Sequence, residues 1–152
     1  MIQARLAQGS DLPTVQAITE AAYVAYVEPF GGPPVPLTED YAPRIAANEV
    51  WIVSQDGVDM ALAVLEAAPD HLAIFSLAVR PEAQGRGLGR WILDFAEDRA
   101  RSLGLPEVRL YTNALMTRNI LIYGKAGYAE TGRTPNPHRP GWIAVHMAKP
   151  LH

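Results

Sequence analysis

The stretch V-R-P-E-A-Q-G-R-G-L-G-R, residues Val79–Arg90, decides the fold. It lies between an apolar run, Leu72–Val79, and an amphipathic run, Leu88–Leu103, and it carries three glycines at every second position. Glycine in or beside a helix costs about 1 kcal/mol relative to alanine. Three of them at a strand-to-helix junction therefore need a reason.

A close approach of a ligand to the main chain would give these glycines a role. Without Cβ atoms at Gly85, Gly87 and Gly89, nothing shields the N–H groups of residues 85–90. The first N–H groups of a helix have no partner inside it, and the helix end carries roughly half a positive charge. The stretch thus predicts an anion site of the kind that phosphates use. The alternative is a glycine-rich turn that only redirects the chain.

Two familiar phosphate-binding motifs do not fit these residues. A P-loop needs glycine, four residues and then Gly-Lys-Ser/Thr, and no such run occurs. A dinucleotide fingerprint, G-x-G-x-x-G, would need a third glycine where Arg90 or Ile92 stands. The strand expected next ends in Tyr111-Thr112-Asn113, without the acidic residue that binds ribose.

Composition limits the classes of protein. The chain has 152 residues, of which 49% are hydrophobic and 19% charged, so we expect a single globular domain over residues 1–152. The net charge of −3 and the lack of a basic run argue against a nucleic-acid partner. No apolar run reaches about 20 residues and no signal peptide is visible, so we expect no membrane partner and a cytoplasmic location. The absence of cysteine excludes disulfides, and the four scattered histidines predict no metal site.

Periodicity predicts the order β-α-α-β-β-β-α-β-α-β-β. The sequence Gln55-Asp56-Gly57 favours a hairpin turn, and the strand Leu72–Val79 should pair in parallel with Val108–Asn113 through the helix between them. The expected strands are Ile2–Ala7, Val50–Ser54, Met60–Glu66, Leu72–Val79, Val108–Asn113, Tyr128–Thr131 and Trp142–Ala148. The expected helices start at Ser10–Pro13, at Thr38 (running to about Asn48), at Gly87 (to Leu103, closed by Gly104) and at Thr117 (to Ala126).

Two of these helices have an evident buried face. The first should bury Val15, Ile18, Ala22 and Ala25. The long one should bury Leu88, Trp91, Ile92, Phe95, Ala96 and Leu103, at i, i+3, i+4, i+7 spacing. A proline-rich loop, Thr134–Gly141, should join the last two strands.

The glycine motif and its context resemble the GNAT acetyltransferase superfamily. Gln84–Gly89 meets the pattern Gln/Arg-x-x-Gly-x-Gly/Ala, with Leu77–Pro81 before it and N-I-L-I-Y-G-K-A-G-Y (Asn119–Tyr128) about thirty residues after it. The resemblance implies an α/β (α+β) fold whose central sheet is mixed and mostly antiparallel, with a parallel, splayed strand pair and flanking helices. It also implies an acetyl-CoA-dependent N-acetyltransferase, that is, an acyltransferase of the transferase class that binds coenzyme A as cosubstrate.

The resemblance also assigns residues to the cofactor. The strand end before the glycines would offer main-chain groups to the pantetheine arm, and the glycine amides would hold the pyrophosphate. Arg86 and Arg90 either pair with phosphates or are solvated, and Lys125 either reaches the 3′-phosphate or lies free on the surface. The full cofactor-binding set is Leu77, Ala78, Val79, Gln84, Gly85, Arg86, Gly87, Leu88, Gly89, Arg90, Asn113, Asn119, Tyr123 and Lys125.

Tyr123 matches the family's tyrosine that protonates the departing thiolate, and it is the predicted catalytic residue; a core aromatic is the alternative. The family's glutamate base would stand eleven residues before Gln84, where this chain has Ala73. Other side chains that can take a proton are Ser76, Glu66, Glu28, His138 and His146, and none is assigned. The alternation of His146 with Trp142 and Ala144 favours a packed core histidine.

The resemblance implies that the acceptor enters near the first two helices, and there we predict that the aromatic side chains Tyr23, Tyr26, Phe30 and Tyr111, beside the short Gly31–Pro36 loop, contact it. The aromatic side chains and the short loop suit a small molecule with a primary amine, to which acetyl-CoA would pass its acetyl group directly. The alternatives are a protein or peptide N-acetyltransferase, or a CoA-binding regulator that has lost its chemistry. A homodimer is common in the family, and the sequence supplies neither an interface nor the identity of the acceptor.

Overall fold

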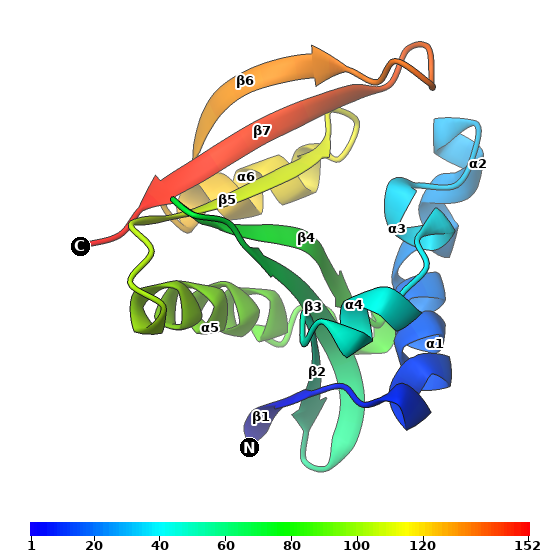
Figure 1. The fold of residues 1–152 in the computed structure, drawn as a ribbon. Helices are drawn as coiled ribbons and strands as arrows, with labels where there is room; N and C mark the ends of the chain where they lie inside the picture. The colour runs from blue at the N-terminus through cyan, green and yellow to red at the C-terminus, as the bar shows by residue number, and fades with distance from the viewer. The chain divides into compact units, whose positions relative to one another are not determined.

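The computed structural model describes all residues, Met1–His152, and forms a seven-stranded sheet with helices between the strands (Figure 1). The strands are β1 (Ile2–Leu6), β2 (Val50–Gln55), β3 (Val58–Ala67), β4 (Leu72–Val79), β5 (Glu107–Asn113), β6 (Ala129–Pro135) and β7 (Ile143–Pro150). The α-helices are α1 (Leu12–Tyr23), α2 (Val27–Phe30), α3 (Val35–Thr38), α4 (Ala42–Ala46), α5 (Leu88–Ser102) and α6 (Thr117–Lys125). Three 3-10 turns are η1 (Gly9–Asp11), η2 (Val24–Tyr26) and η3 (Pro81–Ala83).

The order of the strands in the sheet is β1-β2-β3-β4-β5-β7-β6. Antiparallel pairing joins β1 to β2, β2 to β3, β5 to β7 and β6 to β7. The strands β4 and β5 run parallel, with Leu72 opposite Val108 and Ile74 opposite Leu110. The predicted mixed, mostly antiparallel sheet with one parallel pair and flanking helices is therefore confirmed.

The chain forms two compact units. The first unit comprises Met1–Glu66 and Phe75–Ile92, and the second comprises Ala67–Ile74 and Leu93–His152. Both β4 and α5 begin in one unit and end in the other. No helix is both long and apolar enough to cross a membrane.

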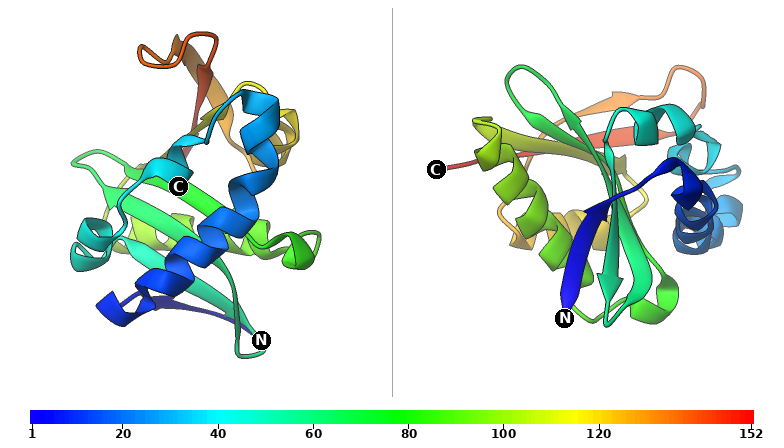
Figure 2. Two further views of the ribbon diagram at one scale, coloured as in Figure 1. Left: turned by 90° about the vertical axis from the view of Figure 1, so that its right-hand side faces the viewer. Right: turned by 60° about the horizontal axis from the view of Figure 1, so that its bottom comes forward.

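In the first unit, α1 lies across one face of β1, β2 and β3 (Figure 2). Its residues Val15 and Ile18 are fully buried against the strands, as predicted. Ala22 packs against this core, whereas Ala25 is exposed because α1 ends at Tyr23 and the chain tightens into η2. The core of this unit consists of Ala7, Val15, Ile18, Tyr41, Ile45, Val50, Ile52, Leu62, Val64 and Ala78.

The predicted turn between β2 and β3 is confirmed. Asp56 and Gly57 both have positive φ, 52° and 82°. Two consecutive left-handed residues form the turn whose twist matches that of a hairpin, and this explains the Asp-Gly pair.

The predicted helix from Thr38 to about Asn48 is wrong. Thr38 ends α3, the chain is extended at Glu39, and the next helix, α4, covers only Ala42–Ala46. Pro43 is the cause, because a proline lacks the N–H that an interior helical residue must donate. It stands in the first turn of α4, where that N–H is not needed.

In the second unit, α6 lies behind β5 and β7 in the view of Figure 1. The face of β5 that bears Leu110 and Thr112 is buried, and so are Val145 and Met147 of β7. On the part of α5 that belongs to this unit, the buried residues are Leu93, Ala96, Glu97 and Ala100. The predicted burial of Leu103 is wrong: the helix ends at Ser102, the predicted cap Gly104 has φ 71°, and Leu103 is 43% exposed.

Candidate functional site

The glycine stretch forms a loop between the end of β4 and the start of α5. Gly85 and Gly87 have φ of 80° and 82°, while Arg86 between them is not left-handed. The helix α5 begins at Leu88, and the N–H of Trp91 donates to the Gly87 carbonyl at 3.0 Å. Left-handed glycines that alternate with residues of other conformation are typical of anion-binding nests, in which successive N–H groups bind one anion. The N–H groups of Gly85–Gly89 donate to no acceptor of the chain.

Gly89 differs from the other two glycines, because neither its conformation nor its packing requires glycine. Its φ is not positive, and a Cβ placed on it would meet no atom within 4 Å. The same open space lies beside Gly85 and Gly87. Neither backbone conformation nor packing within the chain explains the glycine at position 89, but the close approach of a bound group to the main chain would explain it.

The rest of the loop is anchored to the neighbouring strands. The N–H of Arg80 donates to the carbonyl of Met60 on β3 at 2.9 Å, and Ala83 is fully buried. The side-chain amide of Gln84 donates to the Val79 carbonyl at 3.3 Å. The first residue of the motif thus fastens the loop to the end of β4, and the N–H groups that follow are held in place.

At the end of β4 a tyrosine from α1 reaches the strand's main chain. The Tyr23 hydroxyl donates to the Leu77 carbonyl at 3.2 Å and lies 3.4 Å from the hydroxyl of Ser76, which is buried. Tyr23, Tyr26 and Phe30 form a row, with ring centres 6.5 and 5.5 Å apart. Phe30 is only 7% exposed, so most of its surface serves packing.

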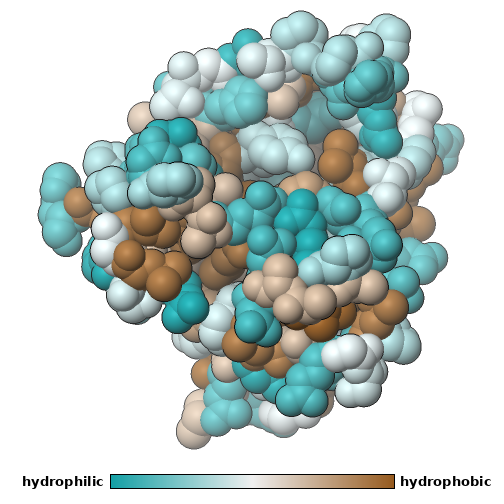
Figure 3. Space-filling view, in the orientation of Figure 1, coloured by the Kyte–Doolittle hydropathy of each residue, from teal (hydrophilic) through white to brown (hydrophobic).

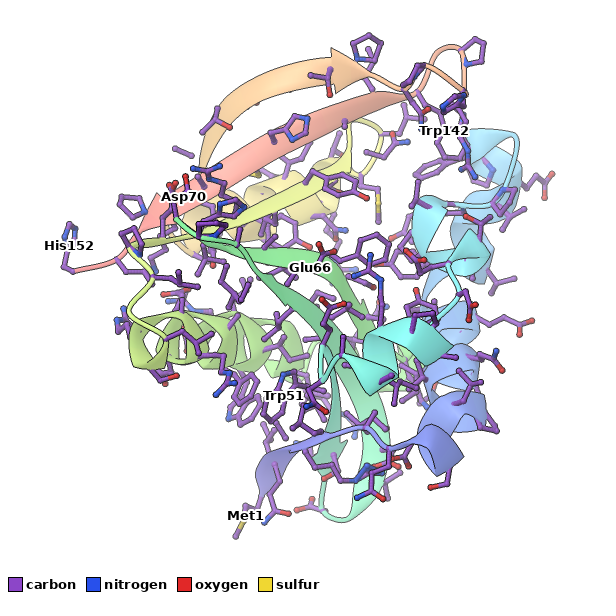
Figure 4. All side chains as sticks on the ribbon, in the orientation of Figure 1. Met1, Trp51, Glu66, Asp70, Trp142 and His152 are labelled. Atoms are coloured by element: carbon purple, nitrogen blue, oxygen red, sulfur yellow. The ribbon has the colours of Figure 1, made fainter.

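Polar side chains gather over α3, α4 and the end of β3 (Figure 3). Arg44 lies at their centre: its guanidinium is 2.7 Å from Glu66, 3.1 Å from Glu39 and 3.2 Å from Glu49. It also lies 3.9 Å above the ring of Phe75. The side chain of Glu66 (Figure 4), one of the groups that could take a proton, is therefore engaged by an arginine.

In the second unit, the turn from β5 to α6 depends on Asn113. Its side-chain oxygen accepts from the N–H of Leu115 at 2.9 Å, and its carbonyl accepts from Met116. Asn119, in the first turn of α6, lies 3.8 Å from the sulfur of Met116. Lys125 is exposed at the C-terminal end of α6.

Tyr123 is half-buried on α6, and its ring packs edge-on against Tyr128 with ring centres 6.4 Å apart. Tyr128 is buried and its hydroxyl donates to Glu97 at 3.3 Å. Burial, together with the negative charge of Glu97, raises the pKa of the Tyr128 phenol well above its usual range. Lys149 completes the network, because its ammonium lies 2.8 Å from Glu97 and 2.9 Å from the Ala126 carbonyl that ends α6.

A feature that the sequence did not reveal lies on the other face of the second unit. His146 of β7 stands opposite Tyr111 of β5, and its Nε2 is 2.8 Å from the hydroxyl of Thr134 on β6. It is half-buried rather than a core residue. Only the register between β5 and β7 reveals this neighbour, because 35 positions separate the two residues along the chain.

Each unit brings together part of the predicted site. The first unit holds Tyr23, Tyr26, Phe30 and the continuous stretch Leu77–Arg90. The second unit holds Tyr111, Asn113, Asn119, Tyr123 and Lys125. The assigned roles of these residues stay predictions.

Known proteins share both the sequence pattern and the fold. The family model described as Acetyltransferase (GNAT) family matches residues 15–128. The chain is 37% identical over 73 residues to the IAA acetyltransferase of Azospirillum brasilense, a match that covers 48% of this chain and 47% of that protein. It is 30% identical over 78 residues to the [ribosomal protein bS18]-alanine N-acetyltransferase of Escherichia coli K12, covering 51% and 53%. The chain thus spans about half the length of these curated relatives.

Solved structures extend the likeness over the whole chain. The E. coli ribosomal-protein-S18-alanine N-acetyltransferase matches with a TM-score of 0.75 and 24% identity, covering 99% of this chain and 94% of that one. The PaiA N-acetyltransferase of Thermoplasma acidophilum, solved in complex with coenzyme A, matches with a TM-score of 0.78 and 16% identity, covering 99% of both chains. At these identities the likeness shows the fold.

Proposed function

The chain belongs to the acetyltransferase (GNAT) family, and we propose that it moves the acetyl group of acetyl-CoA directly to a primary amine of a small molecule. Direct transfer is favoured because the chain has no cysteine, the residue that most readily forms an acyl-enzyme. A cytoplasmic location is part of this proposal.

The observation that carries the proposal is the loop of Gly85–Gly89. Its main-chain N–H groups have no acceptor within the chain, its glycines face open space, and a helix N-terminus follows it. A diphosphate needs several N–H donors at close range with no side chain in the way. The residues present therefore fit the pyrophosphate of CoA.

Other residues would hold the rest of the molecule. The main chain of Leu77, Ala78 and Val79 would pair with the pantetheine arm as a neighbouring strand does. Asn113 and Asn119 would contact the same arm. The guanidinium groups of Arg86 and Arg90 and the ammonium of Lys125 would pair with its phosphates. When bound, acetyl-CoA supplies an acetyl group that is activated as a thioester.

Tyr123 would act as the general acid. A thiolate leaves more readily when a hydroxyl donates a proton to it, and a tyrosine is neutral and carries that proton at pH 7. The ring of Tyr123 packs edge-on against the buried ring of Tyr128. This contact helps to hold the ring in place, which favours a role that needs a positioned donor.

The aromatic side chains of Tyr23, Tyr26, Phe30 and Tyr111 would contact the acceptor. Gly31 and the prolines that follow make a short and rigid segment next to this row, which suits a small amine. An N-terminal amine of a peptide is the second candidate. The named activity of the E. coli relative on an alanine of a ribosomal protein favours it.

A thiol-release assay with acetyl-CoA and four probe amines tests the proposal: tyramine, spermidine, glycinamide and a hexapeptide with N-terminal alanine. We expect transfer to at least one probe, with initial-rate lines that intersect as a ternary complex requires. Preference for the hexapeptide would select the second candidate. The proposal would be contradicted if none of the four amines caused release of CoA from acetyl-CoA and calorimetry detected no binding of CoA.

A further inference from the structure

One face of the second unit carries a histidine to which the proposed reaction has so far given no part. The side chains of Val145 and Met147 point to the buried face of β7, so His146 between them points to the opposite face. On β5, Leu110 and Thr112 are likewise buried while Tyr111 is 40% exposed. His146 and Tyr111 thus lie side by side on the face opposite the buried one.

The contacts of His146 leave one ring nitrogen available. Nε2 lies 2.8 Å from the Thr134 hydroxyl, and the ring centre is 6.1 Å from that of Tyr111. Nδ1 has no hydrogen-bond partner. The strand is fixed at this point because the Thr131 hydroxyl donates to the His146 carbonyl at 3.3 Å. The imidazole is therefore held by one nitrogen and open at the other.

Such an arrangement can take a proton from a ligand. When Nε2–H donates to the Thr134 oxygen, the lone pair of Nδ1 is free to accept. A half-exposed aromatic ring beside it attracts an ammonium group through its π-face. Tyr111 can thus hold a primary ammonium close to the nitrogen that would deprotonate it.

We propose that His146 accepts the proton that the acceptor's ammonium group must lose, and that Thr134 positions its ring. This inference rests on the proposed function, since it supplies the base that position 73, an alanine, cannot provide. The acceptor that fits is a primary amine that is charged in solution.

The proton balance of the reaction is complete with this group. The ammonium gives one proton to Nδ1, and the nitrogen lone pair that it uncovers forms the new C–N bond. The C–S bond breaks, the electron pair goes to sulfur, and Tyr123 donates a proton there. Tyr123 is reprotonated by the second proton that the nitrogen loses, and His146 passes its own proton to solvent.

The charged groups that face His146 from the packed strands are few. From β5 the titratable neighbour is Tyr111. Arg109 lies two residues along the same face and pairs with Glu107 and Asp70. From β6 the neighbour is the uncharged Thr134, with Glu130 and Arg133 paired to each other further along the strand. No carboxylate bonds to the imidazole of His146.

The test is the pH profile of kcat/KM for His146→Gln, measured from pH 6 to 9.5 with the probe amine that the wild-type chain acetylates fastest. We expect kcat/KM at pH 7 to fall about 100-fold, the usual contribution of a general base. The acid side of the profile should move up by at least one pH unit, because only amine that is already neutral would then react. Added imidazole should restore part of the activity, and the Kd of CoA should stay within twofold.

Matched variants separate this role from a structural one. His152→Gln, at the exposed C-terminus, should keep the wild-type profile. Thr134→Val should move the acid side in the same direction as His146→Gln, and Thr134→Ser should restore it. Valine replaces the hydroxyl of Thr134 with a methyl group of similar size, whereas serine keeps the hydroxyl.

Two results would overturn the inference alone: an active wild-type chain whose His146→Gln variant keeps the same pH profile, or a loss that is equal at every pH and not rescued by imidazole. A wild-type chain that acetylates none of the probes would instead contradict the proposed function, and this inference with it.

Discussion

At the scale of single residues, the proposed chemistry depends on the hydroxyl of Tyr123. Its ring is held edge-on against Tyr128, so the removal of one oxygen leaves the packing in place. We expect Tyr123→Phe to lower kcat about 100-fold, because general acid catalysis by a positioned side chain contributes about that much. Steady-state kinetics measures the change in kcat, and calorimetry measures the Kd of CoA separately.

The Kd of CoA should change little in the same variant. If kcat of Tyr123→Phe stays within threefold of the wild-type value, another group protonates the thiolate and the assignment of Tyr123 is wrong. Tyr26→Phe removes a hydroxyl from a residue that we assign to acceptor binding, so its effect should fall on the KM of the amine and leave kcat within threefold of the wild-type value.

Alanine substitutions at Gly89 and Gly87 allow effects on the stability of the fold to be separated from effects on CoA binding. Alanine at 89 lies in the first turn of α5, in ordinary helical conformation and open space, so it should stabilise the fold by up to about 1 kcal/mol. Its methyl group should nevertheless weaken CoA binding at least tenfold, because it would lie between the main chain and the pyrophosphate. Thermal unfolding and calorimetry check the two directions.

Gly87→Ala should weaken binding as well, but at a cost in stability of about 1–2 kcal/mol, because its φ is 82°. If Gly89→Ala binds CoA as tightly as the wild-type chain does, close approach to the main chain is not the reason for that glycine.

At the scale of elements, the join between α5, α6 and β7 depends on a buried ionic network. Glu97 is 4% exposed, and it is held by Lys149 and by the Tyr128 hydroxyl. Glu97→Gln removes the charge but keeps the shape, and it leaves the Lys149 ammonium unpaired. We expect a loss of at least about 2 kcal/mol in the free energy of unfolding, measured with urea.

Glu130→Gln is the matched control, because Glu130 pairs with Arg133 on the surface of β6 in an exposed ion pair. It should leave the urea midpoint nearly unchanged. Equal effects of the two substitutions would show that the buried network does not stabilise this join.

Elements with a clear period could be predicted from the sequence, and elements that depend on one residue could not. The strand β4 matches the predicted Leu72–Val79 because its alternation of apolar residues is regular. The helix expected at 38–48 failed because Pro43 outweighs helix-forming neighbours. The burial of Glu97 has no signal in the sequence, since a charged residue on a helix normally faces solvent.

The candidate site follows the same division. The glycine loop could be proposed as an anion site from the sequence because its residues are contiguous and their spacing matches a known pattern; its role stays a prediction. The sequence offered His146 as one of several proton acceptors but could not single it out, because its neighbours Tyr111 and Thr134 come from two other strands and only the register shows them.

At the scale of the whole molecule, each unit contains one buried tyrosine that should limit stability in alkali. Burial raises the pKa of Tyr41 in the first unit, and burial with the charge of Glu97 raises that of Tyr128 in the second. As the pH rises past about 10, the unfolded chain releases these protons before the folded chain does. The contribution of these two phenols to the free energy of unfolding should therefore be complete below pH 10 and should decrease as the pH rises above it.

Each phenol should contribute up to about 1.4 kcal/mol per pH unit to this fall. Urea unfolding at pH 8, 9.5 and 11 measures it, with Tyr41→Phe and Tyr128→Phe as variants that flatten the dependence. If the free energy of unfolding of the variant that carries both Tyr41→Phe and Tyr128→Phe fell as steeply with pH as that of the wild-type chain, other groups would be responsible for the loss in alkali.

The most direct test of the central claim follows the main-chain N–H groups themselves. In ¹H–¹⁵N correlation spectra, saturating CoA should shift the signals of Gly85–Gly89, and pantetheine, which lacks the pyrophosphate, should leave them in place. If CoA binds while the signals of Gly85–Gly89 stay where they are in the free chain, the loop does not hold the pyrophosphate.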